Sequence, residues 1–154
     1  MAVGAEARLQ EMGIVLPKPL DAGGNYVPAK TVGRIVFLAG VISTGPEGVV
    51  TGTVGSNRSI DEGYEAAKLC ALAQLAALKR HLGSLDAVKQ LVTVNGYVNA
   101  VAGFSDSPKV INGASDLFVA VFGEAGRHVR AAIGVPALPR NALVELQMTV
   151  ETDS

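Results

Sequence analysis

Apolar side chains recur at helical spacing between Ser59 and Gly83. Small and aliphatic residues there fall three or four positions apart, which is typical of a helix with one buried face. Ser59 and Glu62 form a capping box, in which each side chain accepts a hydrogen bond from a backbone N–H near the helix start. Gly83 follows the last apolar position and favours the left-handed conformation that ends a helix. A long helix is therefore predicted from Ser59 to Leu82.

A second apolar stripe runs from Ser107 to Gly123. Ser107 is the expected N-cap, and Pro108 occupies the first helical position, where a missing backbone N–H costs nothing. Gly123 again supplies the end of the helix. A shorter helix is predicted over residues 2–12.

Shorter apolar runs predict strands. They cover residues 26–32, 34–40, 49–54, 90–99, 131–135 and 143–151. In the last of these, Val144, Leu146, Met148 and Val150 should point to one face of a sheet and the residues between them to the other. The order of strands, helix, strand, helix and strands indicates an α+β fold with both helices packed on one face of the sheet.

Composition indicates what covers the other face. Apolar residues make up 49% of the 154 residues and charged residues only 18%, which is more apolar material than one small core absorbs. We therefore expect a homo-oligomer whose partner subunit covers the open face. The length fits a single domain over residues 1–154, with residues 1–24 as its N-terminal extension.

Charge and composition exclude several classes of protein. Lys and Arg number 13 against 14 Asp and Glu, and no basic stripe appears, so a nucleic-acid partner is not expected. No apolar run approaches the roughly 18 residues of a membrane span. Charged residues in the opening segment, such as Glu6 and Arg8, do not fit a signal peptide. Cys70 is the only cysteine, which favours a reducing, cytoplasmic location.

Motifs for metals and cofactors are absent, so neither is expected. Two histidines and one cysteine are a poor supply of metal ligands, and the glycines match neither a Walker loop nor a dinucleotide fingerprint. His81 lies in the last turn of the first long helix, where a cation suits the helix dipole, and is interpreted as a capping residue. Cys70 lies mid-helix and is interpreted as a packing residue. His128 is either an exposed loop residue or a catalytic group.

Two charged residues stand beside apolar segments near the end of the chain. Arg130 precedes the apolar run at residues 131–133, and Glu145 lies inside the last strand. Either could be an ordinary solvent-facing residue. If the last two strands share a sheet, however, the two side chains could share one cleft. A guanidinium binds carboxylates through two parallel hydrogen bonds, and a sheltered carboxyl with a raised pKa can move protons or position water. The pair therefore suggests a site for a small carboxylate-bearing metabolite.

Several motifs resemble those of the Rid (YjgF) family, whose relatives are often labelled endoribonuclease L-PSP. They lie at residues 25–27 (NYV), 36–40 (VFLAG), 83–88 (GSLDAV), 110–112 (VIN), 130–139 (RAAIGVPALP) and 143–146 (LVEL). The last two segments are similar to the family's C-terminal pattern of an arginine, a Leu-Pro pair and a Val-Glu pair. The resemblance covers nearly the whole chain from residue 25 onward. The residue 110–122 helix resembles a distinct long branch.

The resemblance implies a chorismate mutase-like α+β fold with a mixed sheet, in which three subunits surround a central β-barrel and clefts lie between neighbours. Many members hydrolyse reactive enamine and imine acids. In those deaminases the residue matching Arg130 binds the substrate carboxylate, and the residue matching Glu145 positions the water. The carbonyl group of Ala132 would help to hold that water, Tyr26 would line the pocket, and Asn112 would lie near it.

Two positions depart from the deaminase pattern. Those members carry serine and glutamine on either side of the glycine after the second strand, where this chain has Ala39, Gly40 and Val41.

The resemblance as a whole makes an enamine/imine deaminase of small 2-imino acids the leading hypothesis. The alternative is a non-catalytic trimer that binds or senses small carboxylates. A ribonuclease is disfavoured, because the chain is slightly acidic and lacks a histidine pair or a basic groove.

Overall fold

The computed structural model describes residues 3–153 of the chain. The α-helices in this part are α1 (Ala5–Glu11), α2 (Ile60–Leu82) and α3 (Ser107–Phe122). The strands are β1 (Ala29–Val32), β2 (Ile35–Leu38), β3 (Val41–Ile42), β4 (Thr44–Gly45), β5 (Gly48–Val49), β6 (Val88–Asn99), β7 (Val129–Val135) and β8 (Val144–Thr152). Single 3-10 turns occur at η1 (Leu85–Ala87), η2 (Gly123–Gly126) and η3 (Pro139–Asn141).

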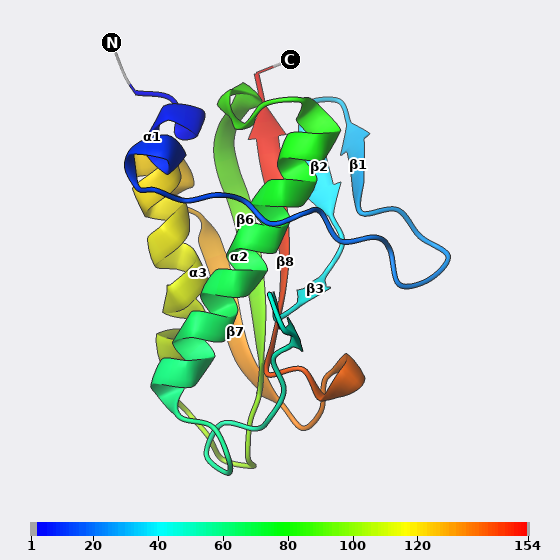
Figure 1. Ribbon diagram of the computed structural model, residues 1–154, viewed down its shortest axis with the longest axis vertical. Coiled ribbons are helices and arrows are strands. Elements are labelled where there is room, and N and C mark those ends of the chain that lie inside the picture. Colours follow the sequence, from blue (N-terminus) through cyan, green and yellow to red (C-terminus); the bar gives the residue numbers. More distant parts are fainter. Residues whose placement is uncertain (1–2, 154) are drawn as a thin grey trace.

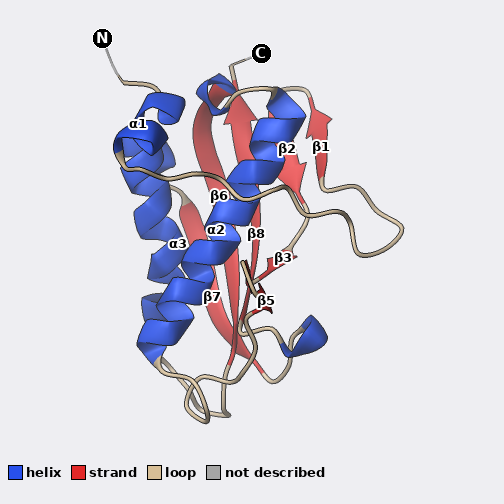
Figure 2. Ribbon diagram, viewed as in Figure 1, coloured by secondary structure: helices blue, strands red, loops and turns tan. Residues whose placement is uncertain are grey.

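The main sheet has the strand order β1-β2-β8-β6-β7, and β3 extends it by pairing with β8 beyond the end of β2. Only the β6–β7 pair of this path is parallel, because α3 carries the chain back between those two strands. Helices α2 and α3 lie side by side over one face of the sheet (Figures 1 and 2). The predicted α+β class, with both long helices on one face, is confirmed.

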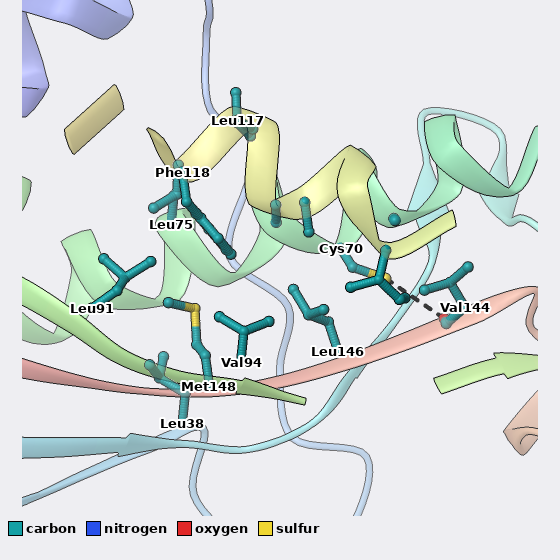
Figure 3. Packing of buried hydrophobic residues seen from close by; sticks show 14 of the residues in the cluster. Leu38, Cys70, Leu75, Leu91, Val94, Leu117, Phe118, Val144, Leu146 and Met148 are labelled. Atoms are coloured by element: carbon teal, nitrogen blue, oxygen red, sulfur yellow. Dashed lines mark hydrogen bonds between the residues drawn. The ribbon is translucent and has the colours of Figure 1, made fainter. Parts of the chain in front are cut away.

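The core lies between these two helices and the sheet (Figure 3). Leu75 of α2 and Phe118 of α3 face Leu146 and Met148 of β8, and all four side chains are fully buried. Each such side chain stabilises the fold by about 1.5–3 kcal/mol relative to exposure. Every second residue of β8, beginning with Val144, is buried, as its alternating sequence predicts.

The opposite face of the sheet carries apolar side chains that the chain itself does not cover. Phe37 of β2 lies between two buried residues of its strand and is 49% exposed. Ile133 of β7 is also 49% exposed and Val129, at the start of that strand, is 66% exposed. The expected uncovered face is therefore present in the single chain.

The structure shifts several predicted boundaries. Helix α1 is shorter than residues 2–12, the first two residues of the chain lying outside the described part. Ser107 is the first residue of α3 rather than its cap, since Asp106 holds the N-cap position without a side-chain hydrogen bond. Tyr26 precedes β1 in a bend rather than lying in a strand. The strand predicted at residues 49–54 is reduced to β5 and isolated bridges, because Gly52 adopts a positive φ of 127°.

None of the helices described is both long enough and apolar enough to cross a lipid bilayer.

Candidate functional site

A cavity of about 770 Å³ opens beside Glu145. It is walled by the segment before β1, which contributes Tyr26, by the junction of β2 and β3, and by one side of α2. The junction contributes Ala39 and Gly40. The Tyr26 hydroxyl accepts a hydrogen bond from the Gly23 N–H at 3.0 Å, which fixes the tyrosine within its own bend. Tyr26 and Glu145, both proposed from the sequence, thus line one cavity.

Glu145 is half-buried in this cavity, and burial raises its pKa above the usual value for a glutamate. The neighbouring backbone at Gly40 leaves room for the carboxyl group, because a Cβ there would lie 2.7 Å from Glu145 Oε2. Burial disfavours the charged carboxylate, so the group is a better proton acceptor than an exposed glutamate once ionised.

Gln74 of α2 also lines the cavity and was not proposed from the sequence. It is fully buried, and its Nε2 donates to the carbonyl groups of Ala39 and Leu146, both at 2.9 Å. Its Oε1 has no hydrogen-bond partner among the described residues. A polar residue within the apolar face of α2, between Ala73 and Leu75, was the signal that could have revealed it.

Arg130 belongs to β7, and its side chain extends from the face of the sheet that α3 covers. Its Nη1 donates to Asn112 Oδ1 at 2.8 Å and to Ser115 Oγ at 3.1 Å, and its Nη2 donates to the Pro108 carbonyl at 3.4 Å. A guanidinium has five N–H donors, so Nε–H and one N–H of Nη2 stay without a partner in the described chain. The edge formed by Nε and Nη2 can bind a carboxylate through two parallel hydrogen bonds. Asn112 and Arg130, both proposed as site residues, are thus in contact within the chain.

His128 stands next to Arg130 and contacts the same helix. Its Nδ1 lies 2.7 Å from the Gly126 carbonyl, which can only accept, so Nδ1 carries the proton. Its Nε2 therefore accepts from the Ser115 hydroxyl at 2.8 Å. Burial lowers the pKa of His128, and the charge of Arg130 lowers it further. The ring also packs edge-on against Phe118, with centroids 6.0 Å apart. His128 is thus a structured, neutral base rather than an exposed loop residue.

The carbonyl group of Ala132 faces away from the sheet. The Val135 carbonyl accepts from the Ala100 N–H at 3.1 Å, so Val135 directs its backbone groups towards β6. Backbone direction alternates along a strand, and β7 runs without a bulge, so Ala132 directs its N–H and carbonyl outward. Since β7 ends the strand order of the described sheet, this carbonyl is available to a ligand or a neighbouring chain.

Arg130 and Glu145 do not share a cleft within one chain. The long strand β6 lies between β7 and β8, with Val94 paired to Arg130 on one side and to Met148 on the other. Strand spacing and rise place the backbones of Arg130 and Glu145 about 14 Å apart. The two side chains also leave opposite faces of the sheet. The two strands do share one sheet, as the expectation of a shared cleft required, but β6 lies between them, so the two side chains do not meet within the single chain.

Cys70 and His81 lie outside both clusters. Cys70 is fully buried in the core, where its thiol donates to the Val144 carbonyl at 3.6 Å (Figure 3). Burial raises its pKa far above the usual value for a thiol. His81 Nε2 lies 2.7 Å from the Thr31 hydroxyl at the end of α2. Among residues 3–153, no group of three metal-ligating side chains gathers at one point.

Comparison with known proteins gives consistent matches over nearly the full length. A family model described as "YjgF/chorismate mutase-like, putative endoribonuclease" matches residues 6–152. Protein TCP17 of Trypanosoma cruzi is 39% identical over 150 residues, which cover 96% of this chain and 94% of that protein. Among solved structures, Atu1372 of Agrobacterium tumefaciens, a protein of unknown function, is 39% identical with a TM-score of 0.88, covering 97% of this chain and 92% of that one. A Shewanella oneidensis MR-1 protein, also described as a "putative endoribonuclease", is 34% identical with a TM-score of 0.92 and coverage of 97% and 99%.

Proposed function

The chain belongs to the YjgF/chorismate mutase-like family, and from this we propose that it is an enamine/imine deaminase acting on small 2-imino acids. The observation that carries the proposal is the half-buried Glu145, whose pKa is raised by burial inside a cavity that also holds Tyr26. A general base with a raised pKa is what the activation of a water molecule near neutral pH requires.

In the proposed reaction, water adds to the carbon of the C=N bond. Ionised Glu145 takes one proton from this water and passes it to the nitrogen, giving a carbinolamine. Glu145 then carries the hydroxyl proton of this intermediate to the same nitrogen as the C–N bond breaks. The products are a 2-oxo acid and ammonia, and Glu145 ends in its starting state. The outward carbonyl of Ala132 would accept a hydrogen bond from the attacking water.

Arg130 would hold the substrate carboxylate through the Nε–Nη2 edge that Asn112, Ser115 and Pro108 leave free. Because Arg130 and Glu145 lie apart in one chain, the proposal requires that neighbouring copies supply them to one cleft. A homotrimer with clefts between subunits satisfies this requirement. It would also cover the exposed side chains of Phe37 and Ile133 and the free edge of β7.

Competition between enzymatic hydrolysis of an imine and its chemical trapping tests the activity. An amino-acid oxidase generates the 2-imino acid in situ, and the imine is allowed to partition between free hydrolysis and trapping by semicarbazide. Purified protein should lower the yield of the trapped adduct, and Glu145→Gln should not. Equal trapping with and without protein, for imines of several chain lengths, would contradict the proposal. Light scattering at micromolar concentration tests the assembly, and a monomer would remove the shared cleft.

A second candidate is a non-catalytic trimer that binds small carboxylates. Ala39 and Val41 favour it, because side chains that flank the glycine in deaminase members are missing from the wall of the Glu145 cavity. This reading predicts calorimetric binding of pyruvate or 2-oxobutanoate that depends on Arg130, together with no effect on imine trapping.

A further inference from the structure

The hydroxyl group of Ser115 is shared by a base and a cation. It donates to His128 Nε2 at 2.8 Å and accepts from Arg130 Nη1 at 3.1 Å. Ser115 is partly buried on α3, while the other two residues come from the loop before β7 and from β7 itself. Three elements therefore meet at a single oxygen atom, beside the edge of Arg130 that is free for a ligand.

We propose that Ser115 and His128 are positioning residues for Arg130, and that binding of a carboxylate by Arg130 is coupled to proton uptake by His128. The inference rests on the proposed role of Arg130 as the carboxylate anchor. Neither residue is assigned contact with the substrate.

The positioning follows from the hydrogen-bond inventory of a hydroxyl group. A serine hydroxyl has one donor and two lone pairs. The Gly126 carbonyl fixes the imidazole tautomer, so the only proton on Ser115 Oγ is directed to His128. The lone pairs are thereby left for Arg130. With Asn112 on the same amino group, this arrangement holds the guanidinium plane and leaves the Nε–Nη2 edge open.

The coupling follows from the charge of Arg130. That charge lies close enough to the imidazole to oppose its protonation, in addition to the effect of burial. A carboxylate bound to the guanidinium would offset the positive charge and make protonation easier. By thermodynamic linkage, the acid should then bind more tightly as the pH falls through the pKa of His128.

Other charged groups around His128 do not offer the same coupling. Glu124 and Arg127 flank it in the chain with exposed side chains. Asp116 of α3 accepts a short hydrogen bond of 2.6 Å from a tyrosine hydroxyl on α2. The neighbouring strand β6 places Thr93 and Val94 opposite the start of β7 and contributes no charge there.

Titration of His128 without any ligand tests the coupling independently of function. The ring protons of both histidines are followed by NMR against pH, and a His81→Gln variant assigns the signals. Arg130→Gln should raise the pKa of His128, whereas Arg127→Gln, which removes an exposed arginine one residue away, should leave it unchanged. An unaltered titration of His128 in Arg130→Gln would overturn the coupling.

Calorimetric binding of pyruvate and 2-oxobutanoate tests the positioning. Ser115→Ala should weaken binding about fivefold, the size of one net hydrogen bond, and Ser115→Thr should restore it. In buffers of different ionisation enthalpy near pH 6, the wild type should take up a fraction of a proton on binding, and His128→Gln none. Wild-type affinity in Ser115→Ala, or unchanged proton uptake in His128→Gln, would refute the proposal. If Arg130→Gln binds pyruvate as tightly as the wild type does, Arg130 is not the carboxylate anchor. The ligand-free titration still decides whether the charge of Arg130 and the protonation of His128 are coupled.

Discussion

Replacing Gly113 with alanine should disrupt a close approach of α2 and α3. A Cβ at this position would lie 2.8 Å from the carbonyl carbon of Tyr64 and closer still to its oxygen. Both atoms belong to the backbone of α2, so no side-chain rotation can relieve the overlap. Since carbon atoms make contact at about 3.5–4.0 Å, the helices would have to separate by roughly 1 Å.

The size of the effect follows from two opposing terms. Overpacking a core typically costs about 1–3 kcal/mol, and a backbone obstacle places Gly113→Ala at the upper end of that range. Alanine gains about 1 kcal/mol over glycine inside a helix. We therefore expect the free energy of unfolding to fall by about 2 kcal/mol. With a urea m-value of about 2 kcal/mol/M, the unfolding midpoint should fall by about 1 M.

Gly63→Ala is the matched control, because Gly63 is buried in α2 at the same helix pair. Its Cβ would meet side-chain methyl groups rather than backbone, two of Val110 at 3.0 and 3.1 Å and one of Val54 at 3.4 Å. The gain in helix propensity should balance that small shift, leaving stability within about 0.5 kcal/mol of the wild type. Urea unfolding followed by circular dichroism, at one fixed protein concentration, measures both variants. A Gly113→Ala protein as stable as the Gly63→Ala protein would refute the reasoning.

Three further predictions concern the candidate site and the residues outside it. Arg130→Lys removes the planar pair of donors and should weaken calorimetric binding of 2-oxo acids by about 2–5 kcal/mol if the charge pair is desolvated; wild-type affinity would contradict the anchor role. Glu145→Gln should retain binding and abolish turnover. Burial raises the pKa of Glu145 in the folded protein above its pKa in the unfolded chain. The wild type therefore loses stability as the pH rises through the unfolded-chain pKa, because the folded state resists ionisation. In urea unfolding, Glu145→Gln should be more stable than the wild type at pH 7 but not near pH 4. Cys70→Ala and His81→Ala should each leave any activity within about a factor of two and cost little stability. The Cys70 thiol should react with a chromogenic disulfide only after unfolding. A hundredfold activity loss, or rapid labelling of the folded protein, would show that these residues do not lie outside the site.

Features set by local sequence were predictable, and features set by distant pairing were not. The capping box of Ser59 and Glu62 and the glycine stop at Gly83 are formed as predicted, because all their atoms lie within one helix and its ends. The inward alternation of β8 follows equally from its own residues. By contrast, the separation of Arg130 from Glu145 depends on which strand lies between them, and spacing along the chain does not reveal strand order.

The candidate site shows the same division. Arg130 contacts Asn112, and Tyr26 lines the cavity of Glu145; all four were proposed from the family resemblance. Ser115 was overlooked because its role is created by contacts with side chains 13 and 15 residues away. Serine in a helix has no distinguishing local pattern, so only the packed structure identifies it.

The position of β8 has a consequence for how the chain reaches this fold. The strand inserts between β2 and β6, pairing Val36 with Val150 across most of the sequence. During synthesis from the N-terminus, β1, β2 and β6 emerge well before the strand that joins them. Until β8 arrives, β2 and β6 have nothing between them, and their edges and apolar faces are open to other chains. The order of translation thus makes completion of the sheet a late event.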